Sequence, residues 1–475
     1  MVSRRHSASS RRPGGAAAGH CAAIIVFVAA LALAVAGPAG ALPSHMLWID
    51  IWGPGVGIDS YTDSAPTVDG GFVAAGVTND SSSGDGADIL VTKFAAADDA
   101  APHEEWVRTW NGPAGLHDDA WAVATDLYGG VIACGNGNTA SGRRDWEIVK
   151  WNATGAFQWA ETYPPDLAGS RATACDVVCD GAGDVYVCGS TQTAANVASL
   201  VVRKLDAGNG GLLWQGRYEG LDGSFNQGVA LVLDDHLNAY VTGACARAGA
   251  DEDIILVKFD TGGNVSPTWV KRIDSGRHLD DTGVALKLQG SSLFVLGGMY
   301  TTAGTRRSVA VARYTTGGVR TWLRIWRDAR TAVDNPHALA VDKYGSVAVA
   351  GSSGFASGRQ HAFLVKWDKG GARTWARISY PKASKMQGFT DLVGDTAGHV
   401  WVSGYAKSAD GDYDWLTARY QPDGRRAWLS RWNGLSDMHD LCATIGLTVT
   451  GKPFAAGSTQ SAFSAENAAA ARYSR

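Results

Sequence analysis

The feature that most constrains the fold is a repeat of 53 to 59 residues that runs along most of the 475-residue chain. Each copy reads as an apolar run ending in glycine, a polar loop, a second apolar run ending in Lys or Arg, and a glycine-containing turn. The glycine falls at Gly76, Gly135, Gly189, Gly243, Gly297, Gly351, Gly404 and Gly457. The basic residue falls at Lys93, Lys150, Lys204, Lys258, Arg313, Lys366, Arg419 and Arg472. Eight copies of both marks indicate one repeat architecture rather than several unrelated domains.

Each copy contains four apolar runs of strand length, separated by turns rich in Gly, Asp and Asn. In the fourth copy these runs are GVALVLD, NAYVTGA, IILVKFD and TWVKRI. Four short strands per unit are typical of a β-propeller blade, and a third run that is apolar throughout suits a sheet packed between two neighbours. We therefore predict that the protein is all-β and that residues 42–475 form a single eight-bladed propeller of four-stranded blades, with seven blades as the alternative.

The eighth copy ends at Arg475 without its fourth strand. In the other copies this strand begins at a tryptophan, found at Trp106, Trp159, Trp214, Trp269, Trp322, Trp375 and Trp428. The missing piece matches LWIDIWGP near the start of the chain, where Trp48 and Trp52 are in register with EWVRTWNGP and AWLSRWNG. We predict that residues 47–55 form the outer strand of the last blade and close the ring, which removes an exposed sheet edge.

Residues 1–41 have the features of a secretory signal peptide. Four arginines precede an apolar run at 22–37, and Ala39-Gly40-Ala41 gives a small-x-small cleavage pattern. The apolar run is short for a membrane span of about 20 residues. We expect a secreted or cell-surface protein with no membrane span after cleavage, and retention of the leader as an anchor is the alternative.

Charge and cysteine content narrow the possible partners. Without the leader the chain has 38 basic and 46 acidic residues, a net charge of −8, and no basic stretch that would favour nucleic acid or an anionic membrane. Six cysteines remain, at Cys134, Cys175, Cys179, Cys188, Cys245 and Cys442. Export permits disulfides among them, but small buried hydrophobic side chains explain them equally well.

The repeat resembles a known family. LVVRKLDAGNGGLLWQGRYEG and FLVKWDKGGARTWARISY are similar to the SBBP repeat of secreted and surface proteins of bacteria. The resemblance implies a propeller and export, and it brings no catalytic motif. The copies differ from one another: the fifth, for example, has Leu288 where five others have a turn aspartate.

The 18 tryptophans suggest sugar binding, but the repeat register places all of them except Trp121 at positions expected in the core. The recurrent Lys or Arg is expected to be structural and to need an acidic partner. The candidates are the acid five residues before it, as at Asp88 and Asp145, or an aspartate of the turn after the first strand.

Candidate binding residues lie at the start of the first strands, which are expected to surround a central channel. They are Asp118, Asp119, Trp121, Asn226, Gln227, Asp280, Asp281, Asp334, Asn335, His337 and Asp440. Oxygen-rich side chains of this kind suit calcium or a small polar molecule; we predict no cofactor, with calcium as the alternative. The competing interpretation is that these side chains cap turns or bind the neighbouring blade.

No catalytic signature is present, and the loops are short and uniform in every copy but the first. We therefore predict a monomeric, non-catalytic binding or scaffolding module whose partner is an extracellular protein, a glycan or a small polar ligand. One alternative is an enzyme with its site at the channel mouth, either a quinone- or metal-dependent oxidoreductase or a carbohydrate-active enzyme. Quinone-dependent dehydrogenases are also eight-bladed, but they carry an adjacent pair of cysteines that this chain lacks. The other alternative is a purely structural surface protein.

Overall fold

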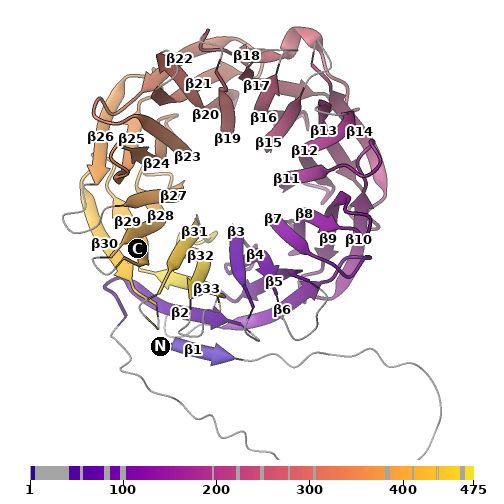
Figure 1. Ribbon diagram of the computed structural model, residues 1–475, viewed down its shortest axis with the longest axis horizontal. Coiled ribbons are helices and arrows are strands. Elements are labelled where there is room, and N and C mark those ends of the chain that lie inside the picture. The colour runs from indigo at the N-terminus through magenta and orange to yellow at the C-terminus, as the bar shows by residue number, and fades with distance from the viewer. Residues whose placement is uncertain are drawn as a thin grey trace, which may run out of the picture.

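The computed structural model forms a ring of blades around a central axis (Figure 1). It describes residues 2–5, 42–53, 57–79, 86–96, 103–194, 197–220, 225–246, 251–276, 279–302, 306–379, 386–408, 411–434, 436, 438–460 and 466–474. In this part of the chain the strands form eight blades of four strands, as the repeat predicts.

The first four blades follow one another along the chain. Blade 1 comprises β3 (Ser60–Pro66), β4 (Phe72–Thr78), β5 (Asp88–Phe94) and β6 (Glu104–Trp110). Blade 2 comprises β7 (Asp118–Thr125), β8 (Val131–Asn138), β9 (Arg144–Trp151) and β10 (Phe157–Tyr163). Blade 3 comprises β11 (Ala172–Cys179), β12 (Val185–Ala194), β13 (Val197–Leu205) and β14 (Leu212–Tyr218). Blade 4 comprises β15 (Asn226–Leu233), β16 (Ala239–Ala246), β17 (Glu252–Phe259) and β18 (Lys271–Ile273).

The second four blades complete the ring. Blade 5 comprises β19 (Thr282–Gln289), β20 (Ser292–Thr302), β21 (Arg306–Thr315) and β22 (Arg320–Trp326). Blade 6 comprises β23 (Val333–Val341), β24 (Val347–Gly354), β25 (Gln360–Trp367) and β26 (Arg373–Ser379). Blade 7 comprises β27 (Gln387–Gly394), β28 (Val400–Lys407), β29 (Tyr413–Tyr420) and β30 (Arg426–Trp432). Blade 8 comprises β31 (Asp440–Leu447), β32 (Pro453–Gln460), β33 (Glu466–Tyr473) and β2 (Met46–Trp52).

Within each blade the strands are antiparallel, and the first strand of each blade lies innermost (Figure 1). The described residues contain one short helix, η1 (Pro267–Trp269), and no helix among them has the length and apolar character needed to cross a membrane.

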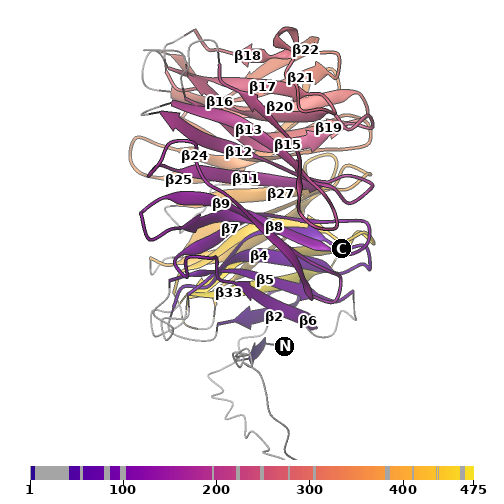
Figure 2. The same cartoon turned by 90° about the vertical axis from the view of Figure 1, so that its right-hand side faces the viewer.

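The predicted ring closure is confirmed. β2 pairs antiparallel with β33, and Trp48 lies opposite Arg472. The backbone N–H of Ser474 donates to the carbonyl of His45 at 2.9 Å, which continues the pairing beyond the strands. Residues 54 and 55 of the predicted strand lie outside the described residues. A short strand that the sequence did not predict, β1 (Val2–Arg5), pairs in parallel with the outer edge of β2, outside the ring (Figure 2).

Neighbouring blades are joined by a repeated tryptophan contact. The indole N–H of Trp106 donates to the carbonyl of Ala153 at 3.1 Å, in the turn of the next blade. Trp322 makes the same contact with Lys369 at 3.1 Å, also 47 residues further along the chain. The closing tryptophan therefore belongs to its own sheet and also anchors the following blade.

Glycine is required in the turn that receives this indole. Gly155 has φ 76°, and a methyl group added there would lie 2.7 Å from the ring of Trp106. Gly424 has φ 80° and the same 2.7 Å relation to Trp375. The turn needs both the left-handed backbone that glycine tolerates and the space left by its missing side chain.

In blades 1, 2, 3 and 6 the recurrent lysine pairs with a turn aspartate rather than with the acid five residues before it. Lys150 lies 2.9 Å from Asp126, and Lys366 lies 3.1 Å from Asp342, with all four side chains buried. Asp145, five residues before Lys150, pairs instead with Arg143. Burial of the cation is thus compensated within blades 1, 2, 3 and 6, which supports the structural interpretation there.

Tryptophan burial also follows the repeat register. Fifteen of the 18 tryptophans are buried, and Trp121 is the only exposed one. The six described cysteines form no disulfide; four are buried, at Cys134, Cys188, Cys245 and Cys442.

Candidate functional site

The structure separates the predicted rim residues into a buried group and an accessible group. The buried residues are at most 1% exposed and are Asp118, Asn226, Asp281, Asp334 and Asp440. Asp281 illustrates their setting, because its carboxylate accepts the backbone N–H groups of Ser275 and Tyr300, both at 2.8 Å. These side chains tie the incoming loop to the strand, as the competing interpretation expects, and a role in ligand binding stays a prediction for them.

The predicted alignment of Asp280 and Asp281 with Asp118 and Asp119 is wrong by one residue. In blade 2, Ala120 pairs with the repeat glycine, Gly135, whereas in blade 5 Gly283 pairs with Gly297. Beyond the bulge Ala122 pairs with Cys134 but Ala285 pairs with Leu296, so the β19–β20 hairpin is one residue shorter and Asp281 corresponds to Asp118. Asp280 is exposed and precedes the strand, and it accepts the backbone N–H of Glu252 at 3.2 Å.

The accessible group lies on the innermost strands and consists of Asp119, Trp121, Gln227, Asn335 and His337. Every innermost strand contains a β-bulge near its start, and Trp121 and His337 are the extra residues of two of these bulges. A bulge turns its extra side chain out of the regular alternation. Trp121 is consequently 49% exposed although it lies in the middle of β7.

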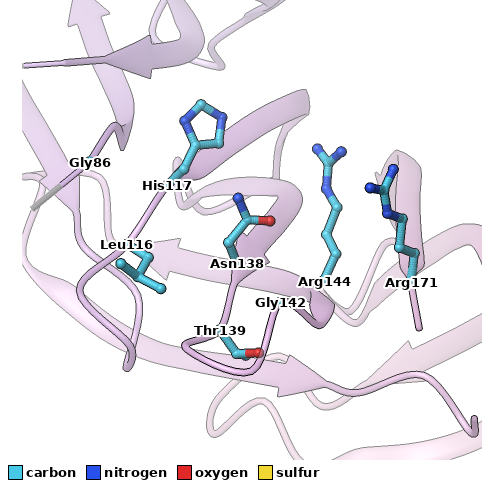
Figure 3. Close-up of a pocket in the computed structure, with 8 residues that line it drawn as sticks. All are labelled: Gly86, Leu116, His117, Asn138, Thr139, Gly142, Arg144 and Arg171. Carbon is cyan, nitrogen blue, oxygen red and sulfur yellow. The ribbon is translucent and has the colours of Figure 1, made fainter. Parts of the chain in front are cut away.

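An open pocket of about 620 Å³ lies next to this strand, where loops of blades 1, 2 and 3 meet. Its lining includes His117, Asn138, Arg144 and Arg171, and the side chains of His117, Arg144 and Arg171 project to one side (Figure 3). Arg144 and Arg171 are brought together because their backbones form a bridge between blades 2 and 3. The pocket therefore depends on contacts between blades.

Arg144 connects the pocket with two of the predicted rim residues. Its guanidinium lies 2.8 Å from the carboxylate of Asp119 and 5.9 Å from the centre of the Trp121 ring. His117 lies 3.7 Å from the same carboxylate. Asp119 compensates one cation of the pocket, and the exposed Arg171 adds a second, so the pocket suits an anionic group.

Sequence reasoning missed a second set of charged residues on the innermost strands. Asp63, Asp176 and Asp391 directly follow the bulges of blades 1, 3 and 7. Each carboxylate accepts a backbone N–H of the next blade, as Asp63 does from Val123 at 2.9 Å. All three stand 13 residues before a repeat glycine, a spacing that would have revealed them.

These carboxylates approach one another although their blades are not neighbours. Burial, with the carboxylates of Asp176 and Asp391 adding to it, raises the pKa of Asp63 to about 7. Burial likewise raises the pKa of Asp176 to about 6, opposed in part by the cation of Lys287 in blade 5. Alternate blades thus place three acids and one lysine near the centre of the ring.

One group of acids has spacing suited to a metal ion. The carboxylates of Asp251, Asp253 and Asp274 have oxygens within 4.8 Å of one another. Asp253 is already paired with Arg272 at 2.7 Å, and a cation beside the guanidinium would be repelled. The calcium prediction therefore gains no support at these three residues.

Comparison with known proteins identifies the fold. No protein-family model and no curated protein matches the sequence. Among solved structures, the chain is similar to the quinohemoprotein alcohol dehydrogenase of Comamonas testosteroni, with a TM-score of 0.55, 10% identity, and coverage of 90% of this chain and 76% of that one. It also matches the periplasmic gluconolactonase PpgL of Pseudomonas aeruginosa, with a TM-score of 0.40, 11% identity, and coverage of 70% and 93%, a likeness too distant to carry an argument. At such identities the first likeness concerns the fold alone: this chain is a β-propeller.

Proposed function

We propose that the protein is an exported, non-catalytic binding module that holds an acidic saccharide at the pocket of blade 2. The observation that carries the proposal is the exposure of Trp121 beside Arg144, in a chain whose other tryptophans are buried or half-buried. The repeat explains those other tryptophans as packing residues. It offers no packing role for Trp121.

The chemistry of the neighbouring residues supports this class of ligand. An exposed indole offers a flat apolar face against which a sugar ring can stack. The guanidinium groups of Arg144 and Arg171 suit a carboxylate or sulfate, because their N–H groups match two acceptor oxygens at once. Asn138 and His117 add polar groups that would fix the orientation of hydroxyls.

Export and membership of the SBBP repeat group are part of the same proposal. The arginine-rich leader with its apolar run supports secretion, and the repeat sequence supports the family. The short turns between strands support binding rather than catalysis, since catalytic groups commonly lie on longer loops. We expect the exported protein to act as a monomer.

The test is a titration of the purified protein with a uronate oligosaccharide and with its neutral counterpart of equal length. We expect binding of the acidic saccharide alone, and a loss of at least tenfold in affinity for Trp121→Ala and for Arg171→Ala. Tyr344→Ala is the matched control, because Tyr344 is 64% exposed and lies under Lys343 in a similar cation–π pair outside the pocket. Equal binding of both saccharides, or full affinity in Trp121→Ala and Arg171→Ala, would contradict the proposal.

A further inference from the structure

Blade 2 differs from the other seven blades at one buried position. Glu147 lies on β9, opposite the repeat glycine Gly135, and is 3% exposed. In the other blades the residue opposite the glycine is apolar: Leu90, Val201, Ile255, Ala310, Phe363, Leu416 and Ala469. Packing at this position therefore needs no carboxyl group in seven blades, and the repeat gives no reason for a buried one in blade 2.

Blades 1 and 8 have a threonine at a position where blade 2 has a glycine. In blade 1 the hydroxyl of Thr78 donates to the buried carboxylate of Asp59 at 2.6 Å. In blade 8 Thr459 donates in the same way to Asp440 at 2.5 Å. Each threonine stands two residues after the repeat glycine, and the corresponding residue of blade 2 is Gly137. The equivalent acid, Asp118, therefore has no hydroxyl donor at this position.

The carboxyl group of Glu147 fills the space of the missing threonine. A methyl group added to Gly137 would lie 2.4 Å from Glu147 Oε1 and 2.6 Å from Asp118 Oδ1, so the two oxygens are at most about 5 Å apart. Glu147 Oε2 is buried without a hydrogen-bond partner among the described residues. Asp118 uses its other oxygen to accept the backbone N–H of Gly112.

We propose that Glu147 and Asp118 share one proton at neutral pH, so that the Glu147 carboxylic acid donates to Asp118 the hydrogen bond that threonine donates in blades 1 and 8. Two adjacent carboxylates removed from water cannot both ionise without a large cost. The proton supplies the missing donor and cancels one of the two charges.

The surrounding charges act in the same direction. Burial, together with the carboxylate of Asp118, raises the pKa of Glu147 to about 8. Burial, with Asp88 and Asp119 nearby, raises the pKa of Asp118 to about 7. Asp145 is a further acid on the same strand as Glu147, and the side chain of Trp110 donates the one hydrogen bond that opposes the shift. As a coupled pair, the two carboxyls lose their shared proton as one unit.

Asp118 is adjacent in sequence to a residue of the pocket, and this step rests on the proposed function. Asp118 is flanked in sequence by His117, which lines the pocket, and by Asp119, which pairs with Arg144. Loss of the proton adds a negative charge beside a site that attracts anions. Anion affinity should therefore fall as the pH rises through about 7 to 8.

The pair is tested first without any ligand. Glu147→Gln keeps the shape and donates permanently, so its melting temperature should match the unaltered protein below about pH 4.5 and exceed it increasingly as the pH rises to about 8. Glu147→Leu should melt lower, and adding Gly137→Thr, which copies the arrangement of blade 1, should restore stability and reduce the pH dependence. An infrared difference spectrum between the unaltered protein and Glu147→Gln should contain the carbonyl band of a protonated carboxylic acid.

An identical pH dependence of melting in the unaltered protein and in Glu147→Gln would overturn the proposal, as would a difference spectrum without that band. A tightly bound divalent cation that disappears in Glu147→Gln would also overturn it, because a metal would then bridge the pair. Equilibrium dialysis against inorganic sulfate tests the link to the pocket. Affinity should fall severalfold from pH 6 to pH 9 in the unaltered protein and fall less in Glu147→Gln, in which His117 is still present. An absence of sulfate binding would count against the pocket alone, whereas equal slopes in the two proteins would refute the link.

Discussion

The last blade is assembled from two distant parts of the chain, and joining those parts directly should leave the fold intact. In a circular permutant with Arg475 fused to Leu42, the two residues after Tyr473 and the four before Met46 would form the connecting turn. Six residues also connect Leu205 to Leu212 in blade 3. His45 and Ser474 already share the 2.9 Å backbone hydrogen bond of such a turn. The new ends would lie in the sequence between β2 and β3.

Deleting the closing strand should have the opposite effect. Removal of residues 42–53 takes away five side chains that are at most 6% exposed: Met46, Trp48, Ile49, Ile51 and Trp52. Full burial of one large apolar side chain contributes about 1.5–3 kcal/mol, so the five together contribute about 8–15 kcal/mol, as an upper estimate. A whole domain is usually stable by about 5–15 kcal/mol. Blade 8 should therefore unfold in this variant.

Urea unfolding followed by tryptophan fluorescence and by circular dichroism measures both variants. We expect the permutant to unfold within about 1 kcal/mol of the unaltered protein, the usual scale of a single moderate change. The deletion variant should show an early transition or no cooperative transition. Unchanged unfolding after the deletion, or a permutant as unstable as the deletion variant, would refute the assignment of β2 to blade 8.

Three further predictions concern single side chains. Gly371→Ala should destabilise the protein by about 2–3 kcal/mol and Gly142→Ala by about 1 kcal/mol in urea unfolding, because both glycines have positive φ but only at Gly371 would the methyl meet an indole, at 3.0 Å. Burial raises the pKa of Asp63 to about 7, against about 4 when unfolded, so its ionisation should lower stability as the pH rises through this range; melting of Asp63→Asn should depend less on pH between 4 and 7. Trp121→Ala should change the free energy of unfolding by less than about 0.5 kcal/mol, because the side chain is 49% exposed, whereas Trp146→Ala, fully buried, should cost about 3–5 kcal/mol.

The fold was predictable because the glycine, the basic residue and the tryptophan recur at nearly fixed spacing in the repeats. Trp48 illustrates this: its distance to Gly76 matches the same interval in the other copies, and it pairs opposite Arg472 as that register requires. The exposure of Trp121 was predictable for the same reason, since a residue that fits no repeat position is free of the packing that buries the others.

The site was less predictable, because the β19–β20 hairpin of blade 5 is one residue shorter than the β7–β8 hairpin of blade 2. A slip of one residue moves a side chain to the other face of its strand. Counting back from the repeat glycine therefore aligns Asp281 with Asp119, although Asp281 corresponds to the buried Asp118. The pocket was missed for another reason, because Arg144 and Arg171 lie on different blades and meet only in the folded ring.

The position of β2 also sets the order in which the ring can be completed during synthesis. Its Trp48 packs against Phe72 and Phe94 of blade 1, with ring centres 6.2 and 6.0 Å away, so β2 can dock once the first blade has formed. The edge of β2 that faces blade 8 then stays uncovered until β33, the last described strand, pairs with it. A chain that lacks β33 leaves this edge uncovered, and such an edge can pair with another chain.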